Sequence, residues 1–191
     1  MRSQREQVKD EWLVLRWQDG EVDAMNELVE RWNARLLRHA RRLTDSDQGA
    51  ADIVQEAWLG IVRTIGRLND PARFSYWAYR IVSNKAADRI RRRSRRRASN
   101  LDDETGIVDL RNSANDSVDA KDEVTSLLKG LSVQHRTVVS LRYGEDLSVK
   151  RIAQVLRLPV GTVKSRLHYA LESMRRSRDI PTSPPRKDGA R

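Results

Sequence analysis

One face of a segment near the C-terminal end combines short polar side chains with cations. At 100° per residue, this face holds Thr162, Ser165, His168, Tyr169 and Glu172, with Lys164 and Arg166 on its flanks. The opposite face is apolar and carries Val160, Val163, Leu167, Ala170, Leu171 and Met174. On a helix, such polar side chains can bond to base edges in the major groove of DNA while the cations reach phosphates. The pattern indicates DNA recognition, and the alternative is an ordinary helical hairpin with a solvated basic face.

A second basic segment, residues 73–97, interleaves aromatic side chains with cations and ends in a run of arginines. Its aromatic half contains Phe74, Tyr76, Trp77, Tyr79 and Arg80. Aromatic rings stack on unpaired bases, which contributes roughly 1–3 kcal/mol per base, and cations bind phosphate whatever the sequence. The combination favours single-stranded or melted DNA. In the alternative interpretation, Phe74 and Trp77 belong to the core by their spacing, Tyr76 and Tyr79 remain for stacking, and the arginine run is a solvated tail.

Acidic and amide side chains lie beside an apolar stripe in the segment DIVQEAWLGIVRTI, at Asp52, Gln55 and Glu56. An acidic patch on a chain of net charge +10 seldom faces DNA. It is a candidate protein-binding surface, and a solvated helix face explains the pattern equally well.

Nothing in the sequence predicts catalysis, a metal or a cofactor. The three histidines, at positions 39, 135 and 168, are far apart and lack metal-ligand spacing, and cysteine is absent. No glycine-rich loop could cradle a phosphate. The net charge of +10 predicts a polyanionic partner. Because no apolar run approaches the roughly 20 residues that span a bilayer, and the N-terminus lacks a signal-peptide core, we expect a cytoplasmic protein without membrane insertion.

Helical periodicity dominates the chain and predicts an all-α fold of two small domains. Apolar stripes predict an N-terminal helical bundle over residues 10–97 and a C-terminal helix-turn-helix domain over 124–176. In the second, Ser148 can cap one helix and Pro159 can begin the next. Residues 98–123 are acidic and poor in apolar side chains, which predicts a flexible linker. The proline-containing end, residues 177–191, is expected to be disordered.

Taken in order, these segments resemble an extracytoplasmic-function (ECF) sigma factor, the two-domain type of bacterial transcription initiation factor. The resemblance rests on four stretches: ELVERWNARLLRHARRLT, ADIVQEAWLGIVRTI, FSYWAYRIVSNKAADRIRRR and LSVQHRTVVSLRYGEDLSVKRIAQVLRLPVGTVKSRLHYALESMRR. They cover residues 22–97 and 124–176. The resemblance implies a factor that binds core RNA polymerase, recognises and melts promoters, and starts transcription. It further implies that residues 10–97 correspond to sigma region 2 and residues 124–176 to region 4.

The resemblance also implies roles at matching positions. Asp52, Gln55 and Glu56 would contact the clamp helices of the polymerase β′ subunit, and the β subunit would be a further partner. Residues implied in promoter melting and −10 binding are Tyr76, Trp77, Tyr79, Arg80, Asn84, Lys85, Arg89 and Arg92, with Asn84 the candidate reader of an everted base. Residues predicted to bind the −35 element are Thr162, Lys164, Ser165, Arg166, His168 and Tyr169.

Further expectations concern partners. Many relatives are held inactive by an anti-sigma factor, which makes such a protein a candidate partner here, and we expect a monomer. A linker of about 24 residues reaches at most roughly 80 Å, so the large polymerase must set the separation of the two domains, and the linker would thread its RNA exit path. A stand-alone regulator is the rival hypothesis, but no dimerising heptads or ligand motif support it.

Two positions depart from the pattern of the family. Arg157 stands where glycine is frequent, and a left-handed conformation there would cost roughly 1 kcal/mol. Tyr169 stands where a second arginine is frequent, so the −35 preference of this chain is expected to differ from that of better-known members.

Overall fold

The computed structural model describes residues 4–100 and 126–179, and within these ranges all regular structure is helical. The all-α prediction is thus confirmed. Most of the predicted linker and of the proline-containing end lies outside the described residues. Two helices extend past the predicted domain limits, because α4 ends at Asn100 and α8 ends at Asp179.

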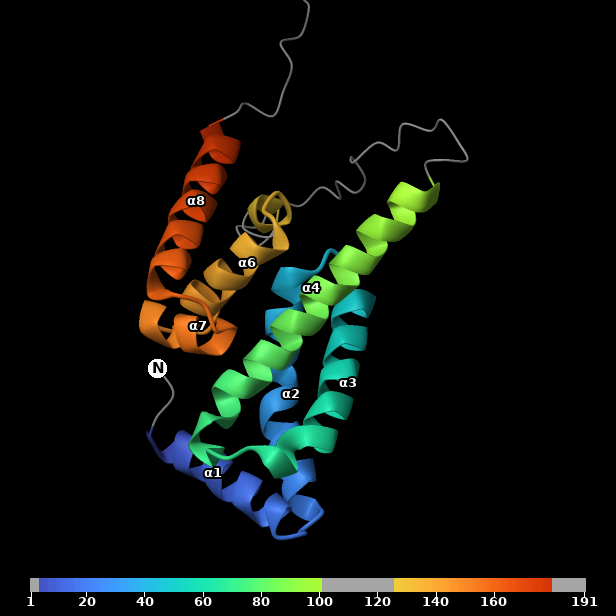
Figure 1. The fold of residues 1–191 in the computed structure, drawn as a ribbon, viewed down its shortest axis with the longest axis vertical. Helices are drawn as coiled ribbons and strands as arrows, with labels where there is room; N and C mark the ends of the chain where they lie inside the picture. Colours follow the sequence, from blue (N-terminus) through green and yellow to red (C-terminus); the bar gives the residue numbers. More distant parts are fainter. Residues whose placement is uncertain (1–3, 101–125, 180–191) are drawn as a thin grey trace, which may run out of the picture.

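The N-terminal domain contains α1 (Gln4–Gln18), α2 (Asp23–Leu43), α3 (Asp47–Thr64) and α4 (Phe74–Asn100), with two short 3-10 turns, Ile65–Arg67 and Pro71–Arg73, between α3 and α4 (Figure 1). The side chain of Ser46 caps α3 by accepting a hydrogen bond from the Gly49 N–H at 3.1 Å. The predicted stripes bury their larger members, including Leu28, Trp32 and Leu36. Trp32 packs edge-on against Phe74 with ring centroids 5.4 Å apart.

The C-terminal domain contains α6 (Val133–Val139), a π-helical turn at Ser140–Gly144, α7 (Val149–Leu156) and α8 (Val160–Asp179). The predicted cap is present, since Ser148 accepts a hydrogen bond from the Arg151 N–H at 3.3 Å. Arg157 ends α7 in the left-handed conformation, with φ 51° and ψ 48°. This conformation turns the chain sharply into α8, which completes the predicted helix-turn-helix.

The two domains pack directly against each other. In Figure 1, α6 and α7 lie beside α2 and α4, and these pairs of helices are in contact. His39 of α2 is fully buried there, with its ring nitrogens 3.0 Å from the hydroxyl of Ser83 and 2.9 Å from that of Ser140. A second contact is the 2.8 Å ion pair between Arg136 and Asp45. The sequence predicted domains whose separation only a larger partner would define, whereas the structure gives them a mutual interface.

Candidate nucleic-acid and protein interfaces

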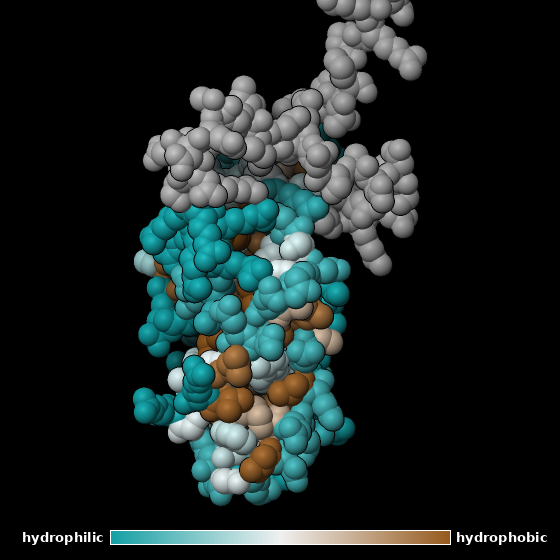
Figure 2. Space-filling view, turned by 90° about the vertical axis from the view of Figure 1, so that its right-hand side faces the viewer, coloured by the Kyte–Doolittle hydropathy of each residue, from teal (hydrophilic) through white to brown (hydrophobic). Residues whose placement is uncertain are grey.

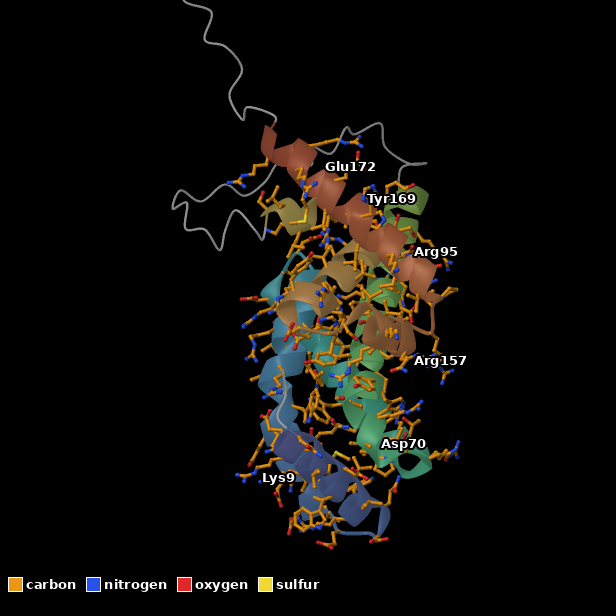
Figure 3. The ribbon with its side chains drawn as sticks, turned by 90° about the vertical axis from the view of Figure 1, so that its left-hand side faces the viewer. Lys9, Asp70, Arg95, Arg157, Tyr169 and Glu172 are labelled. Carbon is orange, nitrogen blue, oxygen red and sulfur yellow. The ribbon has the colours of Figure 1, made fainter. Side chains whose placement is uncertain are left out.

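The first candidate surface is the exposed side of α8. This helix packs Val163, Leu167 and Ala170 against the rest of its domain, as the periodicity predicted. Val160 was expected in the same apolar row but is 40% exposed, because it is the first residue of the helix and lies beyond the packed turns. Figure 3 shows Tyr169 and Glu172 along the outer side of α8, and Arg157 in the turn that precedes it.

Most of the residues predicted to bind the −35 element are accessible on this side. The exposed ones are Lys164, Ser165, His168 and Tyr169, while Thr162 and Arg166 are half-buried. The rings of His168 and Tyr169 meet edge-on with centroids 5.6 Å apart. The six residues therefore form one continuous surface that combines hydroxyl, imidazole, phenol and cationic groups.

Glu172 adds an acidic group to this surface that no predicted role used. Its carboxylate accepts a hydrogen bond from Arg176 and lies 3.8 Å from Nε2 of His168. The bond from Arg176, followed by the charges of Arg176 and His168, lowers the pKa of Glu172. An ionised carboxylate can accept a hydrogen bond from a cytosine amino group, so Glu172 belongs to the surface. Its spacing from His168, one helical turn, was the signal in the sequence.

The second candidate surface lies along α4. Asn84, Arg89 and Arg92 are exposed there, and Tyr76, Trp77, Arg80 and Lys85 are half-buried. Burial, and then the charge of Arg157, lower the pKa of Arg80, so cations of the two domains approach each other at this point.

Tyr79 differs from the other aromatic residues of α4, because it is only 3% exposed. Its ring packs against Trp32 and His39, with centroid distances of 5.6 and 5.3 Å. Only the hydroxyl group reaches the domain interface, where it donates a hydrogen bond to Glu145. In this arrangement the ring is a core group and is not available to stack on a base.

The third candidate surface is on α3, where the predicted protein-binding residues contact the cations of α4. Asp52 accepts a hydrogen bond from Arg89 at 2.9 Å and one from Gln48 at 2.8 Å. Glu56 pairs with Lys85 at 3.2 Å. These surface pairs contribute little to stability, but they place the two predicted sites side by side on neighbouring helices.

An apolar groove runs beside Gln55, between α2 and α3. Its lining includes Val29, Leu37, Trp58, Leu59 and Val62. Figure 2, which faces the side of the molecule where α3 lies in Figure 1, shows hydrophobic side chains gathered among hydrophilic ones. Val62 was predicted in the buried stripe but is 41% exposed, and Leu59 is 53% exposed. The sequence pattern missed this surface because the apolar residues of α3 cover more of the helix than its neighbours bury.

Among the described residues, no group of three or more histidine, cysteine, aspartate or glutamate side chains is arranged to hold a metal ion. No helix in the part of the chain that the structure describes is long and apolar enough to cross a membrane.

Comparisons with known proteins match both halves of the chain. The family model of sigma-70 region 2 matches residues 28–96, and that of sigma-70 region 4 matches residues 127–176. The chain is 31% identical to the ECF RNA polymerase sigma factor SigW of Bacillus subtilis over 175 residues, which cover 84% of this chain and 92% of that relative. It is 32% identical to the ECF RNA polymerase sigma-E factor of Haemophilus influenzae over 178 residues, which cover 87% of this chain and 94% of that relative.

Solved structures show a similar fold. The chain matches CnrH, in its complex with the cytosolic domain of CnrY, at 25% identity and a TM-score of 0.66, covering 91% of this chain and 99% of that one. It also matches the sigma factor RpoE of Bartonella quintana, in complex with the anti-sigma factor NepR, at 19% identity and a TM-score of 0.66, covering 84% of this chain and 99% of that one.

Proposed function

Because the chain belongs to the extracytoplasmic-function sigma factors, we propose that it binds core RNA polymerase through α3 and contacts promoter DNA through α4 and α8. The protein is a transcription initiation factor that directs RNA polymerase to promoters. In the finer division, residues 10–97 act as region 2 and bind the −10 element, and residues 124–176 act as region 4 and bind the −35 element. Such a factor supplies recognition and no chemistry of its own.

The observation that carries this proposal is the presence of an exposed DNA-binding surface on a helix of each matched region. On α8, the polar and cationic side chains from Thr162 to Tyr169 suit the edges and phosphates of duplex DNA. On α4, Asn84 and the cations Arg89 and Arg92 suit a melted strand, with Tyr76 and Trp77 as the aromatic groups nearest the surface. Tyr79 takes part through its hydroxyl group rather than by stacking.

The partner surface for polymerase is formed by Asp52, Gln55 and Glu56 together with the apolar groove beside them. An acidic rim around an apolar groove suits a partner whose surface presents cations around a hydrophobic centre. We assign this surface to the clamp helices of the β′ subunit, with the β subunit as a further contact. A protein with these partners acts as a monomer in the bacterial cytoplasm.

An anti-sigma factor is a further proposed partner. RpoE of Bartonella quintana was solved in complex with the anti-sigma factor NepR, and CnrH, also similar in fold, was solved in complex with the cytosolic domain of CnrY. We propose that this chain is held inactive in the same general way, by a protein that covers its exposed apolar surface.

Reconstitution tests the proposed function. The purified chain is mixed with core RNA polymerase and a promoter-containing template, and the products are complex formation and promoter-specific transcripts. A stand-alone regulator would bind the DNA without starting transcription, and this outcome would contradict the proposal.

The alanine variant of Asp52, Gln55 and Glu56 tests the partner surface. Its affinity for core polymerase should fall at least about tenfold, the loss expected from roughly 1.4 kcal/mol of interface contacts. Binding of DNA by the isolated chain should not weaken, because the change removes the carboxylates that pair with Lys85 and Arg89. Unchanged polymerase affinity in this variant, with both domains folded by circular dichroism, would remove the assignment.

A further inference from the structure

One carboxylate at the domain interface is bound by two donors of the other domain. Oε1 of Glu145 accepts a hydrogen bond from Nη1 of Arg42 at 2.9 Å, and Oε2 accepts one from the hydroxyl group of Tyr79. The Glu145 side chain is 11% exposed and that of Arg42 is 29% exposed. A guanidinium group and a phenol therefore converge on the two oxygens of one anion in a largely desolvated position.

The loop that carries Glu145 is constrained to deliver it. The Glu145 N–H donates to the carbonyl of Ser140 at 3.2 Å, and Asp146 next to it has a positive φ of 51°. Gly144 lies against Arg42, since an added Cβ would be 2.2 Å from Nη1 of that arginine. The close approach of this loop to α2 thus depends on the absence of a side chain at position 144.

The donors that hold Glu145 have the chemistry of a phosphate site. Arginine binds phosphate oxygens through charge-assisted hydrogen bonds, and a phenol hydroxyl can donate to a second oxygen. Both donors belong to the N-terminal domain, and Tyr79 immediately precedes Arg80 on α4, the helix with the proposed −10 surface. Neither a metal nor a second carboxylate is needed to explain the arrangement.

We propose that Arg42 and Tyr79 form a binding site for a backbone phosphate of the promoter strand, which Glu145 occupies while the two domains are packed together. The identity of the ligand as nucleic acid rests on the proposed function. In the packed form the carboxylate of Glu145 competes with the phosphate, so the C-terminal domain lowers the DNA affinity of the N-terminal domain. Separation of the domains exposes the site, and DNA that binds several cations at once displaces the single carboxylate.

A dye pair reports the domain separation in the full chain. The sequence has no cysteine, so Ala34→Cys on α2 and Gln134→Cys on α6, both at exposed positions, carry a donor and an acceptor. The ligand is a short single-stranded oligodeoxynucleotide, titrated at several salt concentrations. Energy transfer should fall as the oligonucleotide saturates the wild-type chain.

Glu145→Gln should lower energy transfer before any DNA is added and raise the affinity for the oligonucleotide roughly three- to tenfold. That gain corresponds to an open form that is about a tenth to a third of the wild-type population. The matched control is Glu30→Gln, which removes the same charge from an exposed position of α2 and should change neither quantity. Asp45→Asn breaks the other interdomain ion pair and should also lower energy transfer and raise affinity, with Glu145 intact.

Arg42→Ala, made in the Glu145→Gln chain, tests the site itself. Affinity for the oligonucleotide should fall at least threefold, and the salt dependence should weaken by roughly 0.7 in the slope of log K against log salt, the value for one phosphate contact on a single strand. Arg41→Ala is the matched control, because Arg41 is adjacent and pairs with Asp47 inside its own domain. The salt slope of that variant should not change.

Two results would overturn the proposal. One is a Glu145→Gln chain with unchanged energy transfer and unchanged affinity. The other is an Arg42→Ala effect no larger than that of Arg41→Ala. Neither measurement uses polymerase, so a chain that fails here but still directs promoter-specific transcription loses only the phosphate site, whereas a chain that fails the transcription assay loses the proposed function.

Discussion

Arg157 occupies an unfavourable position in two respects. Its φ of 51° lies in the left-handed region, where a Cβ costs roughly 1 kcal/mol that glycine avoids. Its charge also acts on Arg80 of the other domain and contributes, after burial, to the lowered pKa of that arginine. Backbone strain and like-charge repulsion thus meet at one residue of the turn between α7 and α8.

Replacement of Arg157 by glycine should therefore stabilise the chain. We expect the free energy of unfolding to rise by about 0.5–1 kcal/mol, because the gain in the folded state exceeds the greater freedom of glycine in the unfolded state. Thermal unfolding followed by circular dichroism should show a midpoint roughly 1–4 °C higher. Arg157→Ala is the control, since it removes the charge and keeps the strain, and it should gain less. A glycine variant less stable than the wild type would contradict this interpretation.

His39 shows how one side chain connects three elements, α2, α4 and the π-helical turn. Its ring contacts Tyr79 and the hydroxyl groups of Ser83 and Ser140, and the nearest charge that acts on it is that of Arg42. Burial, and then Arg42, lower the pKa of His39 from 6.5 to about 3. The folded protein therefore keeps this imidazole neutral under conditions in which the unfolded chain binds a proton.

The sign of the pH dependence follows from this difference. Above pH 6.5 the imidazole is neutral in both states, and as the pH falls from 6.5 toward 3 only the unfolded chain gains the proton. Stability should fall in that window by up to about 1.4 kcal/mol per pH unit from this group. Urea unfolding at pH values between 7 and 5 measures the slope, and His39→Gln should flatten it. Equal slopes in the two chains would show that His39 does not supply the effect.

The helices of the fold could be predicted because each one buries a periodic face. Leu28, Trp32 and Leu36 recur at helical spacing, and Ser148 precedes its helix as a cap. The left-handed turn at Arg157 was anticipated from the position where related chains use glycine. These features depend on neighbours within a few residues of one another, which is the range that sequence periodicity reports.

The domain interface could not be predicted in the same way. His39 and Ser140 are 101 positions apart, and Tyr79 and Glu145 are 66 positions apart. Periodicity shows that a face is apolar but not which element covers it, so Tyr79 was expected at the surface although its ring is buried. On α3 the opposite error occurred, because Val62 belongs to the apolar stripe but no neighbour covers it.

At the scale of the whole molecule, the packed domains and the two proposed promoter elements require different separations. Promoter elements read by α4 and α8 are expected to lie a couple of helical turns of DNA apart, whereas α6 and α7 lie directly on α2 and α4 here. The interface is small and polar at its centre, with an ion pair and a histidine–hydroxyl pair. Interfaces of this kind separate readily when a larger surface competes for either side.

Core polymerase should therefore open the protein. With the dye pair on α2 and α6 described above, energy transfer should fall on addition of core RNA polymerase, before any DNA is present. The variant with alanine at Asp52, Gln55 and Glu56 is the control and should need a higher polymerase concentration for the same change. Energy transfer that stays constant at saturating polymerase would show that the bound factor keeps its domains packed.

Gly144 gives the packed arrangement an unusual genetic property. The guanidinium of Arg42 fills the space where a side chain at position 144 would begin, so even alanine must push that group off Glu145. The arginine itself would survive the exchange and remain able to bind DNA. A constitutive allele, one that escapes the resting state while keeping its promoter contacts, is thus separated from the wild type by a single methyl group.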